Sequence, residues 1–275
     1  MKLKLNELRT EGENKRSIMA FVKVPSAKYQ IYIPSKGRAS NCITANVLLS
    51  EGSEFQIVVE PQDFEEYKKY YADNLLLKLP KNNMGIGYVR AFIKTYATEN
   101  NQSYYWQLDD DLKFKKRIDD NNVYHSALDI FCEIEKYVDE HKNIGIASLR
   151  NQVFAWTLKT ELTLNIQCCA ATLVNTKMEA QYQSNIVEDT DFNMQVLTSG
   201  LCTVTFDKLL FMTGTPSKLK GGCSGAAYYD KLTEYQENFV SKWGNSFVIN
   251  KTKDGTKLKG KGIWKSFKQK PIKNK

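Results

Sequence analysis

Three consecutive aspartates, Asp109, Asp110 and Asp111, follow the apolar segment 104–108. An apolar run rich in β-forming residues predicts a buried strand, so these carboxylates stand at a strand end. Because side chains alternate along a strand, we expect Asp109 and Asp111 to share one face and Asp110 to point the other way. Two carboxylates so placed are hard oxygen ligands for Mg²⁺ or Mn²⁺, and such an ion keeps positions open for a diphosphate. The alternative is a solvated acidic turn.

A second group of acids occupies residues 188–191, at the start of a helix predicted over residues 185–199. The helix dipole favours acids in a first turn, which alone would account for them. A sugar-transfer site, however, needs a carboxylate that removes the proton of the attacking hydroxyl. We therefore predict a division of labour, in which the aspartate triplet holds the metal and the cluster at Glu188 and Asp189 supplies the base.

The elements that position these acids form a pattern of strands alternating with helices. Such spacing indicates βαβ units, and therefore an α/β fold with a mostly parallel central sheet flanked by helices. Residues 115–120 are predicted to be a charged loop. The predicted strands are 29–34, 55–60, 75–79, 104–108, 144–148 and 201–206, with a further apolar run at 167–174. The predicted helices are 41–49, 61–72, 85–99, 126–141, 185–199 and 230–242.

Ligands of open α/β sheets bind beyond the carboxyl ends of the strands, and three polar features follow strands at that edge. They are the turn at residues 35–38, Glu60 and the aspartate triplet. The turn offers backbone N–H groups with Lys36 and Arg38, a set suited to an anion. An ordinary tight turn would use the same proline and glycine. The coincidence of all three at one edge favours a ligand site.

Arg90 stands in the first turn of the helix predicted to begin at Gly85, where it can reach the aspartates or a nucleotide. The alternative is a surface arginine. Gly85 and Gly87 fall short of the GxGxxG fingerprint because position 90 is arginine, so they are a weak NAD signal. Residues 221–225, GGCSG, are either a lid over the site or an ordinary surface loop. The six cysteines form no CxxC pair, which favours reduced thiols in a core.

The net charge of +8 is concentrated at the C-terminal end. Residues 251–275 hold ten lysines and one aspartate, which leaves residues 1–250 at −1. Such a tail indicates a polyanion partner, with nucleic acid favoured over membrane, or else a solubilising end. Trp264 and Phe267 among the lysines favour binding, since aromatic rings stack on bases. We predict one domain over 1–250, with a lead-in arm at 1–28, and a Lys-rich tail.

Membrane insertion and secretion are not indicated. No apolar stretch approaches the roughly 20 residues that cross a bilayer, and the first residues form no secretory apolar segment. A cytoplasmic location is therefore expected.

Several of these segments together resemble the GT-A glycosyltransferases. They are IPSKGR after the first strand, VVE after the second, GIGYVR at a helix start, WQLDDD and VEDTDF. More narrowly, residues 29–213 resemble the TET-associated glycosyltransferases of phages. The resemblance implies a GT-A, Rossmann-like fold and transfer of glucose from UDP-glucose to glucosylated 5-hydroxymethylcytosine in double-stranded phage DNA, inside an infected bacterium and as protection against host restriction. Alternatives are transfer to 5-hydroxymethylcytosine itself, transfer to a non-DNA glycan, and a non-enzymatic nucleic-acid-binding protein.

The resemblance also implies roles for individual residues. Asp111 matches the aspartate that binds Mn²⁺ or Mg²⁺, with Asp109 as its partner nearer the ribose or sugar. Asp189 matches the base of inverting members, with Glu188 beside it. Many GT-A enzymes supply a further metal ligand, often histidine, from the C-terminal part, where this chain has none. The residues expected on the donor side are Ser35, Arg38, Glu60, Arg90, Asp109 and Asp110.

Overall fold

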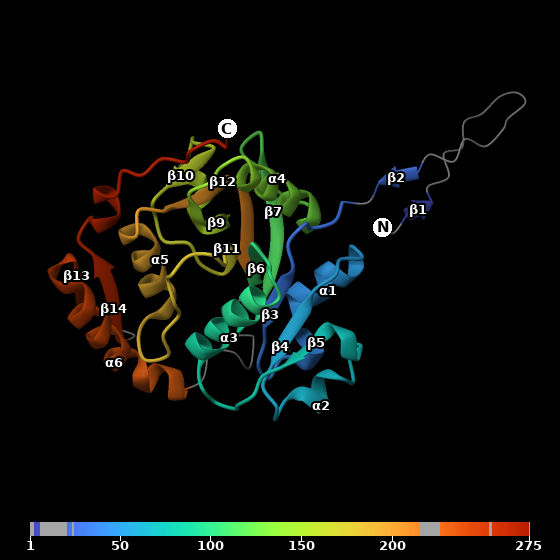
Figure 1. Ribbon diagram of the computed structural model, residues 1–275, viewed down its shortest axis with the longest axis horizontal. Coiled ribbons are helices and arrows are strands. Elements are labelled where there is room, and N and C mark those ends of the chain that lie inside the picture. The colour runs from blue at the N-terminus through green and yellow to red at the C-terminus, as the bar shows by residue number, and fades with distance from the viewer. Residues whose placement is uncertain (1–2, 6–20, 24, 215–225, 253–254, 275) are drawn as a thin grey trace, which may run out of the picture.

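A computed structural model describes residues 3–5, 21–23, 25–214, 226–252 and 255–274. One large sheet runs through the body of the molecule, with helices on both faces (Figure 1). The predicted lead-in arm is described only in part, and the predicted loop at 221–225 lies outside the described residues. No helix in the described part of the chain is both long and apolar enough to cross a membrane.

The strands of the central sheet follow the order β5-β4-β3-β6-β11-β9-β12-β7-β8, with β10 beside β12. Pairing is parallel from β5 to β6 and again between β9 and β12, whereas β11, β7, β8 and β10 pair antiparallel with their neighbours. The α/β class with a central sheet is thus confirmed. Its strands are β3 (Ile31–Pro34), β4 (Gln56–Val59), β5 (Leu76–Lys78), β6 (Tyr104–Leu108), β7 (Leu112–Ile118), β8 (Asn121–Tyr124), β9 (Ile144–Asn151), β10 (Leu162–Leu164), β11 (Ala171–Asn175) and β12 (Cys202–Thr213).

Helices cover both faces of the sheet. Side chains of α1 and α4 share one apolar core with the sheet, and α3 and α5 share another on the opposite face. In the first core, Trp106 stacks on Phe131 of α4 with ring centroids 4.4 Å apart. The helices are α1 (Ile43–Ser50), α2 (Phe64–Tyr67), α3 (Ile86–Glu99), α4 (Ala127–Asp139) and α5 (Glu188–Thr198). The helix expected at 61–72 is therefore confined to its centre, and turns flank it.

The expectation of a charged loop at 115–120 was wrong, because β7 occupies most of it. Leu112 and Phe114 are buried while Lys113 is exposed, so the segment alternates as a strand with one covered face. Four cations in five residues, at positions 113–117, mask that alternation. Pairing with β12 supplies the partner that the local sequence does not show.

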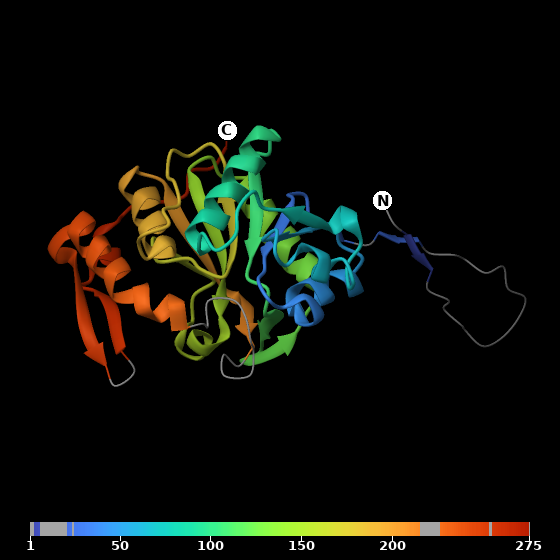
Figure 2. The same cartoon turned by 90° about the horizontal axis from the view of Figure 1, so that it is seen from below.

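The C-terminal part forms a unit at one end of the molecule, and β1 (Leu3–Leu5) and β2 (Phe21–Lys23) lie at the other (Figures 1 and 2). The unit comprises α6 (Ala226–Trp243) and a hairpin of β13 (Phe247–Thr252) and β14 (Gly255–Gly260). The chain then returns along the body, where Lys142 N donates to Ile272 O at 3.0 Å and Asn274 N to Glu140 O at 2.8 Å. The predicted Lys-rich tail thus contains a strand and a segment that pairs with the main body.

Candidate active site

The three aspartates occupy a turn immediately after β6, at the carboxyl end of the parallel strands. Its backbone is hydrogen-bonded to three other segments of the chain, which fixes the Cα positions from which the carboxylates project. The hydrogen bonds that hold it run from Thr44 Oγ1 to Asp109 O (2.5 Å), Thr44 N to Asp110 O (3.1 Å), Asp109 N to Ala170 O (2.8 Å) and Gly214 N to Asp111 O (3.0 Å). Thr44, in the first turn of α1, was not predicted, because nothing in its local sequence distinguishes it.

The carboxylates of this turn contact two different arginines. Asp109 Oδ1 lies 3.2 Å from the guanidinium of Arg90, on the side of α3 and α5. Asp110 and Asp111 both face Arg38, the second at 3.7 Å from Nη1. Asp109 and Asp111 thus have different cationic partners, yet the charge of Asp111 contributes more than that of Asp110 to the raised pKa of Asp109. The expectation that these two carboxylates share one face stays a prediction.

The turn at residues 35–38 wraps around Asp110. The hydroxyl of Ser35 and the guanidinium of Arg38 both donate to the Asp110 carboxylate. Tyr67 completes the network from α2, since its hydroxyl lies 2.6 Å from Ser35 Oγ and accepts from Arg38 N at 3.1 Å. Burial raises the pKa of Asp110, and its bonds to Ser35 and Arg38 oppose that rise. Asp110 therefore organises the loop from inside, and Tyr67 is a site residue that no sequence signal revealed.

Glu60 is almost fully buried and holds a neighbouring loop. Its carboxylate forms an ion pair with Lys36 Nζ at 2.8 Å and accepts from Asn83 N at 2.9 Å and Gln62 Nε2 at 2.8 Å. Lys36 also donates to Asn83 Oδ1 at 2.6 Å. The structure therefore brings Glu60 to the same edge as Ser35 and Arg38, as the sequence predicted, with its oxygens already engaged by these loops.

Arg90 joins two acidic groups, Asp109 and Glu188, that lie 79 residues apart in the sequence. Its Nη1 donates to Glu188 Oε1 at 2.9 Å, and its Nη2 donates to Asp109 Oδ1 at 3.2 Å. The side chain is buried, and its Nε has no hydrogen-bond partner among the described residues. Burial raises the pKa of Asp109 to about 6 and that of Glu188 to about 7, although Arg90 opposes both rises. Arg90 is thus a site residue and not a surface arginine.

Asp189 lies beside this pair at the start of α5 and is half-buried. Gln167 Nε2 donates to its Oδ2 at 3.1 Å, and Thr190 N donates to its Oδ1 at 2.6 Å. Asp189 and Arg90 also line one small cavity together with Cys169. The side chain is therefore oriented and reachable, while Glu188 is occupied by Arg90.

The helix that carries these acids is anchored to the C-terminal unit. Asp191, fully buried in α5, receives hydrogen bonds from Trp243 Nε1 at 2.8 Å and Gln195 Nε2 at 2.7 Å. Lys242 forms an ion pair with the same carboxylate at 2.7 Å. The acids at 188–191 therefore divide, with Asp191 serving the packing of α6.

Gly87 in α3 is required by close packing. A Cβ there would lie 2.2 Å from Gln183 O, so only glycine lets the segment before α5 approach the first turn of α3. This approach brings Arg90 and Glu188 within reach of one another. The glycine pattern near residue 87 therefore reflects packing of α3 against this segment.

Comparison with known proteins identifies the family once this arrangement is known. The model of the TET-associated glycosyltransferase family matches residues 29–222, most of the chain and every site residue above except those of α6. The chain belongs to the TET-associated glycosyltransferase family. No curated protein matches it. Among solved structures it resembles the crystal structure of A197 from STIV, with 13% identity, a TM-score of 0.40 and coverage of 68% of this chain and 85% of that one.

In this TET-associated glycosyltransferase, the acids at this edge that could hold a divalent ion are Asp109 and Asp111. No group of three or more His, Cys, Asp or Glu residues in the described part of the chain is arranged to hold a metal. Mg²⁺ in proteins commonly takes one or two carboxylates and completes its shell with substrate phosphates and water. The Asp111 side chain is 16% exposed and that of Asp109 36%, so both remain open to a ligand. Two hard oxygen donors at this edge fit such an ion.

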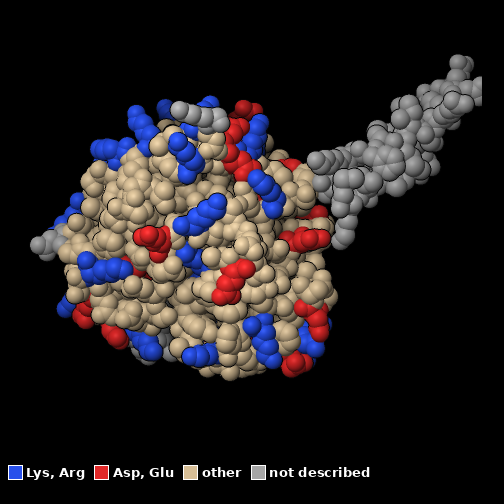
Figure 3. All heavy atoms as spheres, viewed as in Figure 1, with Lys and Arg blue, Asp and Glu red and all other residues tan. Residues whose placement is uncertain are grey.

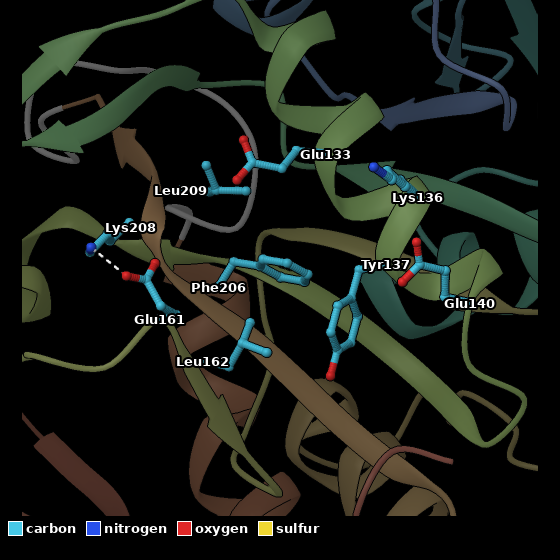
Figure 4. Close-up of a pocket in the computed structure, with 9 residues that line it drawn as sticks. All are labelled: Glu133, Lys136, Tyr137, Glu140, Glu161, Leu162, Phe206, Lys208 and Leu209. Atoms are coloured by element: carbon cyan, nitrogen blue, oxygen red, sulfur yellow. Dashed lines mark hydrogen bonds and ion pairs between the residues drawn. The ribbon is translucent and has the colours of Figure 1, made fainter. Parts of the chain in front are cut away.

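A separate cavity of about 350 Å³ lies on the α4 side of the sheet (Figure 4). Side chains from α4 and β12 form its walls, and Lys208 pairs with Glu161 at its margin. None of the acids described above lines it. It is therefore distinct from the site at the strand ends. Its lining residues are Glu133, Lys136, Tyr137, Glu140, Glu161, Leu162, Phe206, Lys208 and Leu209.

Proposed function

We propose that this glycosyltransferase transfers glucose from UDP-glucose to a sugar hydroxyl of glucosylated 5-hydroxymethylcytosine in DNA, with inversion at the anomeric carbon. One observation carries the proposal: Arg90 bridges Asp109 of the aspartate turn to Glu188 at the start of α5. A carboxylate for the donor side and a carboxylate for the acceptor side thereby belong to one connected cluster. Sugar transfer needs both, on opposite sides of the reacting carbon.

The donor side is the edge formed by the turn at 35–38 and the aspartate turn. The two cations of this turn, Lys36 and Arg38, suit the phosphates of a UDP-sugar. Arg38 lies between Asp110 and Asp111, so it couples the position of this turn to that of the aspartates. Ser35 and Glu60 keep the two loops in place through their buried hydrogen bonds. Donor binding would thus use a preorganised surface.

Asp111, with Asp109 beside it, would hold a Mn²⁺ or Mg²⁺ ion. When bound, the ion offsets the negative charge that grows on the UDP leaving group. The two aspartates supply the hard oxygen ligands that these ions prefer. Arg90 keeps Asp109 oriented from the other side.

The acceptor side is the start of α5. Asp189 would take the proton from the acceptor hydroxyl. The oxygen of that hydroxyl bonds to the anomeric carbon while the bond from this carbon to UDP breaks. Gln167 and Thr190 orient this carboxylate, which leaves it in one position for the incoming hydroxyl. Glu188 is held by Arg90 and would position the cluster.

A transfer assay tests the proposal. The protein is incubated with radiolabelled UDP-glucose, Mn²⁺ or Mg²⁺, and matched duplexes that carry cytosine, 5-hydroxymethylcytosine or its glucosylated form. Label in the glucosylated duplex alone is the expected result, and omission of the metal should abolish it. Label in the 5-hydroxymethylcytosine duplex would instead identify a first-step transferase. Absence of label from every duplex, with the protein folded, would contradict the proposal.

A further inference from the structure

One face of the β7–β8 hairpin carries several cations. Along β7, Phe114 and Lys116 face α4, where Phe114 packs edge-on against Phe131 at 5.3 Å and Lys116 pairs with Glu133 at 2.7 Å. Because side chains alternate along a strand, the residues between and beside them project from the opposite face. Those residues are Lys113, Lys115 and Arg117.

Exposed aromatic rings lie among these cations. Lys115 Nζ lies 4.5 Å from the ring centroid of Tyr124 on β8, and the Arg117 guanidinium lies 5.3 Å from that of Trp156 in the 3-10 helix η3 (Gln152–Thr157). Tyr124, Trp156 and Phe154 are each more than 60% exposed. Large rings left open to water and interleaved with cations form a surface suited to nucleic acid, since cations neutralise phosphates and rings contact bases.

The position of this surface relative to the site is fixed by the topology. β7 begins at the residue after Asp111, so Lys113 lies two residues from the proposed metal ligand. The face that carries Lys113 is the face on which α3 and α5 pack, opposite α4. Asp189 stands at the start of α5 on that same side. A ligand lying across the hairpin is therefore on the acceptor side of the aspartate turn.

The last part of the lysine-rich C-terminal segment, residues 263–274, lies at the wrong edge of the sheet for an acceptor. Asn143, directly before β9, donates to Lys270 O at 2.9 Å, and Gln269 Nε2 donates to Leu197 O near the end of α5 at 2.7 Å. The segment 263–274 therefore runs along the amino ends of β9 and β12, whereas the aspartates follow the carboxyl end of β6. In the space-filling view, basic side chains gather along the margin that this segment follows (Figure 3).

We propose that the face of β7, β8 and η3 holds the DNA acceptor, with Lys113 and Lys115 on its phosphates and Phe154 and Trp156 against its bases or sugars. This surface then replaces the Lys-rich C-terminal segment as the acceptor contact. The inference rests on the proposed function, because it requires a DNA acceptor. It differs from that proposal in naming which surface presents the modified base to Asp189.

Matched charge variants separate the two surfaces. The double variant Lys113→Gln/Lys115→Gln alters the hairpin, and Lys268→Gln/Lys270→Gln removes the same charge from the C-terminal segment. Affinity for a fluorescent duplex is measured across a salt series, with thermal melting to confirm folding. Loss of two phosphate contacts should lower the slope of log affinity against log salt by about 2. The hairpin variant should show this change and a raised KM for DNA, while the C-terminal variant matches the unaltered protein.

A third variant, Trp156→Ala, tests the aromatic part. It should weaken duplex binding roughly tenfold without changing the salt slope, since stacking carries no charge. The inference would be overturned if Lys113→Gln/Lys115→Gln and Trp156→Ala both kept the DNA affinity and the KM for DNA of the unaltered protein. If the unaltered protein still labelled DNA, the proposed function would stand. A reduced slope in the C-terminal variant alone would overturn it as well. If the unaltered protein neither binds nor labels any duplex, the proposed function itself fails, and the inference fails with it.

Discussion

The two halves of the central sheet are built differently, and the difference follows their proposed tasks. In the parallel half, from β5 to β6, the polar side chains at the strand ends are buried and bonded to one another, as Ser35, Arg38 and Asp110 show. In the antiparallel half, β7 and β8 leave cations and rings open to solvent. A small donor of fixed shape suits a preorganised pocket, whereas a long polyanion suits an open, charged surface. Arg90 pairs with Asp109 at the end of the parallel half and with Glu188 at the start of α5.

Replacing Asp111 by Asn should have the largest effect, because it removes the proposed metal ligand on the donor side. We expect loss of both UDP-glucose hydrolysis and sugar transfer, while DNA affinity remains. Release of UDP and incorporation of label into DNA measure the two activities. Asp73→Asn, which removes the same charge from an exposed aspartate outside the site, provides a matched control whose activity should be unchanged. Full activity of the Asp111 variant would show that the turn is only structural.

Asp189→Asn should break the acceptor half alone. Removal of a general base typically lowers the rate by about 10²- to 10⁴-fold, so kcat for transfer should fall in that range with the KM for UDP-glucose unchanged. Glu188→Gln is the informative neighbour, because it weakens the anchor of Arg90 and should disturb donor binding too. An Asp189 variant whose kcat stays within twofold of the original would place the base elsewhere.

Gly87→Ala tests the packing of α3 against the segment before α5, which brings Arg90 and Glu188 together. Since the added Cβ would meet Gln183 O at 2.2 Å, the segment before α5 must move, and overpacking of this kind costs about 1–3 kcal/mol. A lowered melting temperature and a weaker coupling of Arg90 to Glu188 are expected. Thermal denaturation measures the first, and kcat at saturating substrates measures the second. An unchanged melting temperature would mean that the segment adapts freely.

Tyr67→Phe should give the smallest effect and one confined to the donor half. It removes one hydroxyl that contacts Ser35 and Arg38 N, and a single buried hydrogen bond contributes about 1 kcal/mol. We expect the KM for UDP-glucose to rise roughly fivefold, with the affinity for DNA unchanged. Steady-state kinetics with each substrate varied in turn distinguishes the two. A change in DNA affinity instead would show that the halves are not separable at this residue.

The sequence was sufficient for the class of the fold and for the edge at which the site lies, because strand ends carry local signals such as the turn at 35–38 and the aspartate triplet. It was insufficient where tertiary contacts decide. The Arg90 bridge joins elements far apart in the chain, and Tyr67 comes from a helix with no distinguishing motif. β7 was predicted to be a loop because its four cations obscure the alternation of buried and exposed side chains. The cationic partners of the three carboxylates, Arg38 and Arg90, come from segments distant in the chain, so no local pattern shows them.

Calorimetric titration of UDP-glucose in the presence and absence of Mn²⁺ tests the central claim most directly, namely that the metal and the base reside on different elements. It should be performed on the unaltered protein, Asp111→Asn and Asp189→Asn. We predict that Mn²⁺ strengthens donor binding in the unaltered protein and in Asp189→Asn, and has no such effect in Asp111→Asn. Loss of the Mn²⁺ effect in both variants, or in neither, would contradict this division of labour.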